Sequence, residues 1–291
     1  MNVFTATQLL PDVQAQPDFR EQRIDAVGVK GIRYPIVVKS GGRDIHTIAH
    51  LSMTVALPPE VKGTHMSRFI ELLEMRAGSL DQIGFRSMVF EMLDRLGASS
   101  GSITMYFPYF VEKLAPVSGV SSLLDHDVEW TGSIGEDGHY TFRMRVKVPA
   151  TSLCPCSKEI SAYGAHNQRS HISIEAGICG AMSMEELIAI AESSASCEVY
   201  GLLKRADEKY VTERAYDNPK FVEDLVRDVA HALDQDRRIL DYAVEAENFE
   251  SIHNHSAFAR IERDKSIVDA ARAAKRLMAM AEQPDLARIV P

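Results

Sequence analysis

The chain has 291 residues, of which 45% are hydrophobic and 25% charged, and its formal net charge is −9 at pH 7. This composition is ordinary for a globular protein of one large or two medium domains. The acidic balance argues against a general nucleic-acid-binding protein, which needs a basic face. No run approaches the roughly 18 to 20 apolar residues of a membrane span, and the N-terminus lacks the pattern of a secretory signal. Four cysteines, two of them nearly adjacent, do not suggest a disulfide scaffold, so we expect a reduced, cytoplasmic protein.

The first half of the chain predicts strands, then two helices, then strands again. A polar opening with scattered prolines indicates an extended arm over residues 1–26. Apolar and β-branched runs predict strands at 28–39 and 45–57, separated by the Gly41-Gly42 turn. Apolar residues at helical spacing then predict helices at 67–76 and 80–96. Strand character returns at 102–114 and 127–134.

The second half repeats this order. We expect strands at 140–148 and 171–179, followed by a helix that opens at Ser183 with Glu186 three residues later, which is a capping-box pattern. A second helix is expected to start at Asn218-Pro219, a cap followed by proline. Strands at 239–246 and 257–261 close the repeat, and the alanine-rich stretch 266–280 predicts one more helix.

This double pattern indicates the α+β class, with two tandem units that each carry an antiparallel sheet and two helices on one face. The expected boundaries are an N-terminal arm at 1–26, a first unit at 27–138, a second unit at 139–265 and a helical C-terminal tail at 266–291.

The segment with the clearest chemistry is 151–171, which gathers Cys154, Cys156, His166 and His171 at the end of a predicted strand. Thiolate and imidazole ligands suit zinc and related divalent metals. The two cysteines are too close in sequence to bridge each other comfortably. The segment therefore indicates a metal site or an activated thiol, with half-buried cysteines beside solvated histidines as the structural alternative.

Six short motifs together resemble the type IB GTP cyclohydrolases, bacterial enzymes that open folate and pterin biosynthesis. They occur in order as Asp12-Val-Gln, Val27-Gly-Val-Lys with Arg33-Tyr-Pro, Gly63-Thr-His-Met-Ser-Arg-Phe, Ser152-Leu-Cys-Pro-Cys-Ser-Lys-Glu, Gly164-Ala-His-Asn-Gln and Glu250-Ser-Ile-His-Asn-His. The resemblance implies the tunnelling fold, in which the sheets of several units close into barrels. It also implies a homotetramer with active sites between subunits, acting on GTP and not on nucleic acid or membranes.

The family's activity is hydrolysis of GTP at guanine C8, which gives formate and 7,8-dihydroneopterin triphosphate. The resemblance implies that Cys154, His166 and Glu208 hold a divalent metal (zinc, manganese or iron), so that Cys154 is also a catalytic residue. A bound metal makes water nucleophilic near neutral pH. By the same resemblance His253 transfers protons, and Glu223 accepts hydrogen bonds from the guanine N1–H and 2-amino group.

Other residues receive weaker assignments. Candidates for substrate phosphate or for a supporting role are His255, His171, His65, Lys158 and Arg169, and Lys204, Arg205 and Arg68 are further cations for the triphosphate. Without the resemblance, Glu208 is a residue of a solvated face and Glu223 a favoured helix-start carboxylate. Cys156 is a second ligand or only a neighbour, and His46 and His50 share a strand face. Cys179 and Cys197 are expected to be small buried residues.

Two other function classes stay open. Some tunnelling-fold enzymes reduce a nitrile on a deazapurine through a cysteine nucleophile and need no metal. A non-catalytic purine-binding protein on the same fold is the other alternative. An archaeal relative of the family forms a cyclic phosphate product from GTP, which the sequence does not separate from the bacterial reaction.

Overall fold

The computed structural model describes residues 12–14, 16–76 and 78–266, which form two compact units. The first takes the described residues up to Phe107 together with Thr131–Thr141, and the second takes Pro108–Trp130 and the described residues from Phe142 onward. Strands β3, β4 and β5 contribute residues to both units. No described helix is long and apolar enough to cross a membrane.

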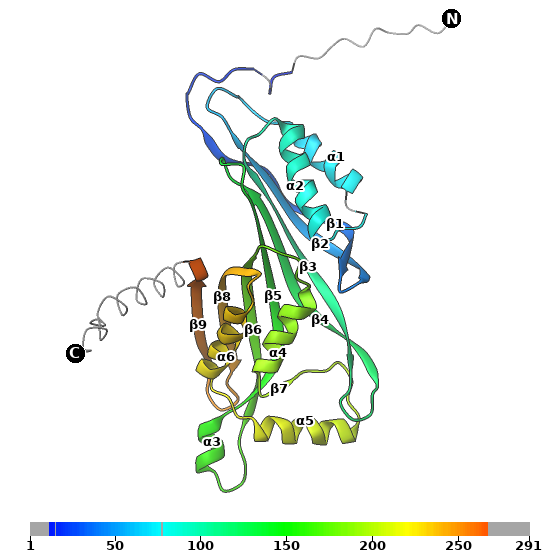
Figure 1. Cartoon of the computed structure of the whole chain (residues 1–291), viewed down its shortest axis with the longest axis vertical. Coiled ribbons are helices and arrows are strands. Elements are labelled where there is room, and N and C mark those ends of the chain that lie inside the picture. The colour runs from blue at the N-terminus through cyan, green and yellow to red at the C-terminus, as the bar shows by residue number, and fades with distance from the viewer. Residues whose placement is uncertain (1–11, 15, 77, 267–291) are drawn as a thin grey trace, which may run out of the picture. The chain divides into compact units, whose positions relative to one another are not determined.

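The first unit is a strand hairpin followed by two helices and further strands (Figure 1). It contains β1 (Ile24–Ser40), β2 (Arg43–Leu57), α1 (Met66–Arg76) and α2 (Gln82–Leu96), together with the first part of β3 (Gly101–Leu114) and the last part of β4 (Ser121–Ile134). The β1–β2 and β2–β3 pairs are antiparallel. Gly41 and Gly42 have positive φ angles of 54° and 77°, which glycine adopts easily in such a turn.

The helices of this unit are buried on the side that faces the strands. Phe69, Leu72 and Leu73 of α1 and Phe85 and Met88 of α2 are fully covered. The Asp81 side chain caps α2 by accepting from the Gly84 N–H at 2.7 Å, and the helix ends at Gly97 in the left-handed conformation.

The second unit repeats the arrangement with additional short elements. It contains β5 (Tyr140–Leu153), α3 (Pro155–Ile160), β6 (Asn167–Ile178), α4 (Met184–Ser194), β7 (Cys197–Glu198), α5 (Arg205–Asp217), α6 (Val222–Gln235), β8 (Ile239–Phe249) and β9 (Ser256–Asp264). The strands run antiparallel in the order β5-β6-β8-β9, with β7 paired to β5.

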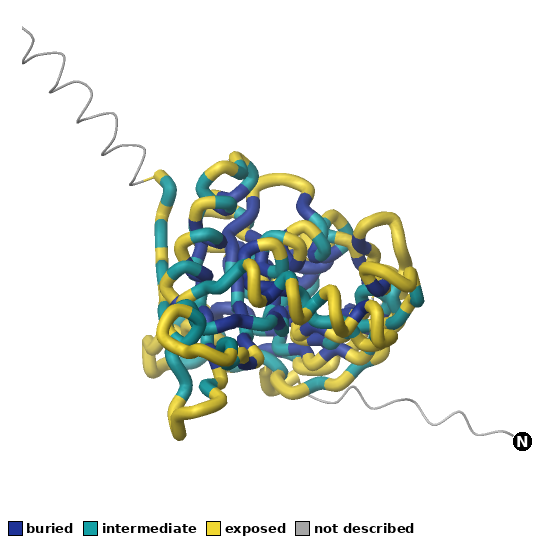
Figure 2. The backbone as a smooth tube through the Cα atoms, turned by 90° about the horizontal axis from the view of Figure 1, so that it is seen from below, coloured by how far each residue is buried: buried dark blue, intermediate teal, exposed yellow. Residues whose placement is uncertain are grey.

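Side chains alternate along these strands, so that one face of the sheet is apolar and buried and the other carries charged residues. Met144, Val146 and Val148 of β5 are buried, on the face that α4 and α6 cover in Figure 1. Arg143 points to the opposite face, where it pairs with Glu175 and Asp241 across neighbouring strands. Figure 2 shows buried backbone running through the interior and exposed backbone on loops and outer helix sides.

The predicted class is confirmed: the structure is α+β, and each unit has the sheet-plus-helix-pair pattern of the tunnelling fold. The capping box is also confirmed, since Glu186 N–H donates to Ser183 Oγ at 3.2 Å and Ser183 N–H to Glu186 Oε2 at 2.7 Å. The boundary after residue 138, which follows the repeat of elements, stays a prediction. The predicted helical tail lies outside the described residues from 267 onward.

The prediction for Asn218 was wrong. Asn218 ends α5, and its amide side chain donates to the carbonyl of Ala195 at 2.9 Å, while α6 starts at Val222. Helix α5 was missed because it lacks an apolar stripe: only Asp207 and Ala215 are buried along it. Such a helix is stabilised by contacts at its ends rather than by an amphipathic face.

Candidate active site

Cys154 lies at the junction between β5 and α3, where the chain turns into a short helix. It is the residue before Pro155, the first helical position, and its backbone is extended with φ −69° and ψ 117°. The Cys154 Sγ accepts a hydrogen bond from the Ser157 N–H at 3.4 Å. Cys154 is half-buried, whereas Cys156 in the first turn is exposed. The Cys154 thiol therefore has a defined position at the end of the strand.

His166 is brought beside Cys154 by the pairing of β5 with β6, which places Leu153 opposite Asn167. The Cys154 N–H donates to the His166 carbonyl at 3.1 Å. Ser157 joins the same two residues: its hydroxyl donates to the Cys154 carbonyl at 3.1 Å and accepts from the His166 N–H at 3.2 Å. The structure therefore brings Cys154 and His166 together.

The His166 ring contacts the loop between β8 and β9. Its Nδ1 lies 3.0 Å from Gln168 Oε1 and 3.2 Å from Ser251 Oγ. The same loop carries His253 and His255, both exposed, whose rings stack at 5.2 Å with an interplanar angle of 15°. The proposed proton-transfer residue thus lies on a loop that reaches the proposed metal ligand.

Glu208 is exposed in the first turn of α5, next to a carboxylate that anchors this helix. Asp207 is completely buried, and it accepts from the backbone N–H groups of Val117 and Ser118, each at 2.8 Å, and of Lys204 at 2.8 Å. The Ser118 hydroxyl adds a fourth bond at 2.6 Å. Burial by itself raises the pKa of Asp207, but these hydrogen bonds outweigh it and hold the pKa well below its usual range.

Glu208 is not gathered with the other two proposed ligands. Within residues 12–14, 16–76 and 78–266, no three His, Cys, Asp or Glu side chains form a group that could hold a metal ion. The part of α5 that contacts α3 is its far end, where Lys158 Nζ donates to the Tyr216 carbonyl and lies 4.2 Å from the centre of the Tyr216 ring. Glu208 is about 12 Å away from Tyr216 along the helix axis, because each residue adds 1.5 Å.

Glu223 is exposed in the first turn of α6. The segment that leads into this helix passes beside the Cys154 junction, since the Lys220 N–H donates to the Leu153 carbonyl at 3.1 Å. The start of α6 is therefore connected to the strand end that carries Cys154.

The remaining candidates are scattered. Arg169 is exposed in β6. The His171 ring packs edge-on against Phe249 at 4.9 Å, its Nδ1 is buried without a hydrogen-bond partner among the described residues, and burial lowers its pKa. Lys204 and Arg205 are exposed at the start of α5.

Two other candidates belong to the first unit and are engaged there. His65 Nε2 lies 3.1 Å from Asp12 Oδ2, and Arg68 donates to the Arg95 carbonyl at 2.8 Å. His46 and His50 are both exposed on β2, as their spacing predicts. The prediction for the outlying cysteines is half right: Cys197 is buried, with its pKa raised to about 11 by burial, but Cys179 is exposed.

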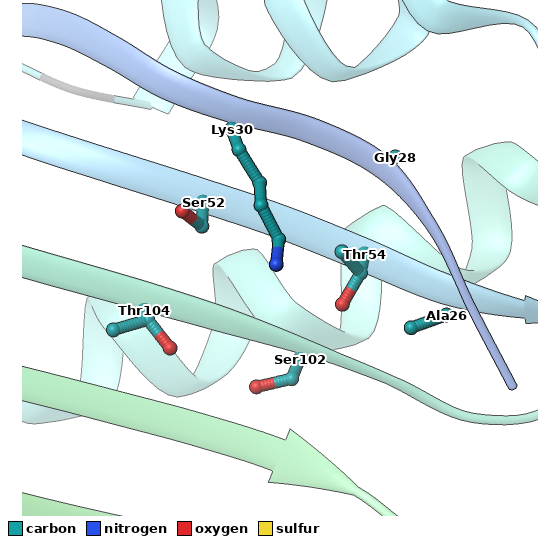
Figure 3. A pocket seen from close by; sticks show the side chains of 7 residues that line it. All are labelled: Ala26, Gly28, Lys30, Ser52, Thr54, Ser102 and Thr104. Atoms are coloured by element: carbon teal, nitrogen blue, oxygen red, sulfur yellow. The ribbon is translucent and has the colours of Figure 1, made fainter.

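The first unit also has a hollow of about 580 Å³ on its sheet. Figure 3 shows the Lys30 side chain extended over it between the hydroxyls of neighbouring strands. Its lining is Ala26, Gly28, Lys30, Ser52, Thr54, Ser102 and Thr104. No predicted site residue lines it.

Sequence reasoning gave no role to Asp207, Gln168, Glu250 or Ser251. The one local signal was for Gln168, because it follows His166 by only two residues in the sequence. The other three are linked to the site through contacts between segments far apart in the sequence, which no local pattern reveals.

Comparison with known proteins assigns the chain to a protein family. A family model described as type I GTP cyclohydrolase folE2 matches residues 10–259. The chain belongs to this family. GTP cyclohydrolase FolE2 of Azoarcus sp. (strain BH72) is 58% identical over 260 residues, covering 89% of this chain and 96% of the relative. GTP cyclohydrolase FolE2 of Paraburkholderia xenovorans (strain LB400) is 57% identical over 266 residues, covering 91% and 99%. Among solved structures, uricase from Arthrobacter globiformis aligns with a TM-score of 0.47 and 7% identity, over 82% of this chain and 93% of that one.

Proposed function

We infer that this chain hydrolyses GTP at guanine C8 to give formate and 7,8-dihydroneopterin triphosphate, with Cys154 and His166 at the centre of the site. As a member of the family it is a GTP cyclohydrolase, a hydrolase of folate biosynthesis. The observation that carries the assignment of the site is the joining of Cys154 and His166 through Ser157. A cysteine beside a histidine also suits an activated cysteine nucleophile, so what favours the hydrolase over the nitrile reductase is the 57–58% identity to chains named GTP cyclohydrolase FolE2.

The proposed metal ligands are Cys154, His166 and Glu208. A thiolate, an imidazole and a carboxylate suit Zn²⁺ and also admit Mn²⁺ or Fe²⁺. Support for Cys154 and His166 comes from their backbones, which are neighbours at one strand end; Glu208 is proposed from the family motif and stands apart from them among the described residues. A bound metal would supply an activated water at neutral pH.

The proposed proton-transfer residue is His253. It is exposed, so it is accessible to a substrate, and its ring is stacked on that of His255. Its loop touches the His166 ring through Ser251. An imidazole can both donate and accept protons, which opening of the guanine ring requires.

Glu223 is proposed to bind guanine. A carboxylate accepts from the N1–H and the 2-amino group together, as a charge-assisted pair of hydrogen bonds. Its exposed position at the start of α6 leaves its oxygens available. For the triphosphate, Arg169 is an exposed cation of the second unit, whereas the Lys158 amino group is already held by the Tyr216 carbonyl.

We further propose that the chain acts as a homo-oligomer, with a tetramer as the expected form and with residues of more than one subunit at each active site. The exposed His253, Glu208 and Glu223 are consistent with a site that a second copy completes.

The decisive experiment incubates the purified protein with GTP and Zn²⁺, Mn²⁺ or Fe²⁺ and measures formate, together with fluorescent neopterin after oxidation and dephosphorylation. We expect both products, their loss after exhaustive chelation, and their return on adding metal. Release of formate with a cyclic phosphate instead of the triphosphate would identify the archaeal type of product. Full turnover in protein shown to be metal-free would refute the metal assignment.

A further inference from the structure

The His166 ring is the first member of a short chain of hydrogen bonds that leads away from Cys154. Its Nδ1 lies 3.0 Å from the side-chain oxygen of Gln168, and the Gln168 side-chain nitrogen donates to a carboxylate oxygen of Glu250 at 3.4 Å. Gln168 is only 7% exposed and Glu250 is half-buried. This series of hydrogen bonds therefore runs through the protein rather than through bulk water.

The direction of each bond follows from the chemistry of its far end. An ionised carboxylate can only accept, so the amide nitrogen of Gln168 must face Glu250. The amide oxygen then faces His166, and since a carbonyl oxygen can only accept, its 3.0 Å contact favours a proton on Nδ1; the Ser251 hydroxyl, 3.2 Å from the same nitrogen, can accept from Nδ1 as well. The neutral imidazole consequently keeps its lone pair on Nε2, which is the nitrogen left to bind a metal.

Buried contacts behind this chain hold its members in place. The hydroxyls of Ser152 and Ser170 lie 2.6 Å apart, and Ser170 Oγ donates to the Asn248 side chain at 2.7 Å. These three residues are at most 3% exposed and connect the ends of β5, β6 and β8. Gln168 lies two residues before Ser170, and Glu250 lies two residues after Asn248, so the same contacts fix both.

We propose that Gln168 and Glu250 are positioning residues that hold His166 in the tautomer with the proton on Nδ1 and so prepare Nε2 as a metal ligand. The proposal rests on His166 being a ligand, as inferred above. Such outer partners orient an imidazole and raise its basicity as a ligand, and their loss typically weakens metal binding about 10- to 100-fold. Glu250 directly precedes Ser251, so the same chain connects the ligand to the loop of His253.

The tautomer can be measured without any metal. Protein labelled with ¹⁵N-histidine, freed of metal, should give an His166 signal with a protonated Nδ1 and an unprotonated Nε2; the signal is assigned by its loss in His166→Ala. Glu250→Gln keeps the shape but lets the Gln168 amide turn either way, so we expect the Nε2-protonated form to appear. Glu262→Gln, an exposed carboxylate of β9, is the matched control and should leave the signal unchanged.

Zn²⁺ affinity, measured by competition with a chelator, provides the second readout. Gln168→Leu should bind Zn²⁺ about 10- to 100-fold more weakly than wild type, Glu250→Gln should show a smaller loss in the same direction, and Glu262→Gln no change. Glu250→Gln preserves volume and keeps the test valid if Gln168→Leu fails to fold. An Nε2-protonated His166 in the wild type, or wild-type affinity in a folded Gln168→Leu, would overturn the proposal. Wild-type affinity in His166→Ala would instead refute the proposed metal site, whatever the tautomer.

Discussion

Ser157 links Cys154 to His166, because its hydroxyl forms hydrogen bonds with backbone groups of both residues. Its own N–H also bonds to the Cys154 sulfur. The backbones of the two proposed ligands are therefore held together by the β5–β6 pairing and by Ser157 of α3.

Replacing Cys154 should separate the roles of the two neighbouring cysteines. Cys154→Ala removes a proposed ligand, so we expect metal retention to fall and activity to drop by more than about 100-fold. Cys156→Ala, in the exposed first turn of α3, should keep most of the activity. The check is metal content beside turnover of GTP for both variants, and the opposite ranking would make Cys156 the ligand.

Glu223→Gln tests the guanine anchor. The amide keeps the size but presents a donor toward the guanine donors, so we expect kcat/KM for GTP to fall by at least about 100-fold while bound metal is unchanged. Kinetics and metal content are measured on the same preparation. Near-wild-type turnover would leave Glu223 as a carboxylate that only favours the start of a helix.

At the scale of elements, α5 is held at both ends and is exposed between them. Asp207 bonds its first turn to the β3–β4 turn at residues 117 and 118, and Lys158 bonds its last turn to α3. The position of Glu208 therefore depends on a buried neighbour rather than on packing of the helix face.

Asp207→Ala should weaken metal binding although Asp207 is not a proposed ligand. Without the carboxylate, the backbone donors at 117, 118 and 204 lose their acceptor, the start of α5 loosens, and we expect a metal affinity on the order of tenfold lower. Ser183→Ala, which removes the cap of α4 at a cost of about 1 kcal/mol, is the control and should not alter metal affinity. Equal metal affinity in Asp207→Ala and wild type would show that metal binding does not depend on the hydrogen bonds by which Asp207 holds the start of α5.

The sequence predicts the elements that have a buried apolar stripe, and the contrast between the helices shows why. Helix α6 buries Val222, Leu225, Val226, Val229, Ala230 and Leu233, and its periodicity is visible in the order of the amino acids alone. Helix α5 buries a carboxylate and an alanine, so nothing periodic marks it. In the site, the cysteine–histidine segment is apparent as local spacing. The partners Glu250 and Ser251 depend on the pairing of β6 with β8 and could not be predicted locally.

At the scale of the whole molecule, acid stability should depend on one buried histidine. His126 of β4 is 1% exposed, and neither ring nitrogen makes a hydrogen bond of good geometry among the described residues, although the Lys147 backbone lies near. Burial, with Lys113 acting in the same direction, lowers the pKa of His126 from 6.5 to about 4.

The sign of the effect follows from proton linkage. Between pH 6.5 and 4 the unfolded chain binds a proton that the folded chain does not, so stability is complete above pH 6.5 and falls as the pH drops toward 4. The loss at pH 4 is about 3 kcal/mol at most. His126→Leu should remove this part of the pH dependence of unfolding by urea. If the free energy of unfolding of His126→Leu falls between pH 6.5 and 4 as steeply as that of the wild type, the acid sensitivity belongs to other groups.

The edge strands predict association. Among the described strands the order begins with β1 and ends with β9, and apart from the bridge between Val38 and Leu80 no described strand covers the outer side of β1 or β9. Open strand edges tend to pair with other chains. We expect light scattering to give an oligomer, with the tetramer as the expected mass, and activity to fall as the protein dissociates on dilution. A stable and fully active monomer would contradict both the assembly and the shared active site.

The hydrogen bonds that close the loop from Cys154 to His166 allow the length of this loop to vary. Both ends of the loop are fixed, at the strand pair and at Ser157. The exposed tip near Ile160 and Tyr163 therefore does not determine the positions of Cys154 and His166. Lengthening a flexible loop costs little conformational entropy, about 0.6 kcal/mol for each doubling. Insertions at this tip are thus compatible with an intact donor pair, and distant members of the family need not preserve the number of residues between the cysteine and the histidine.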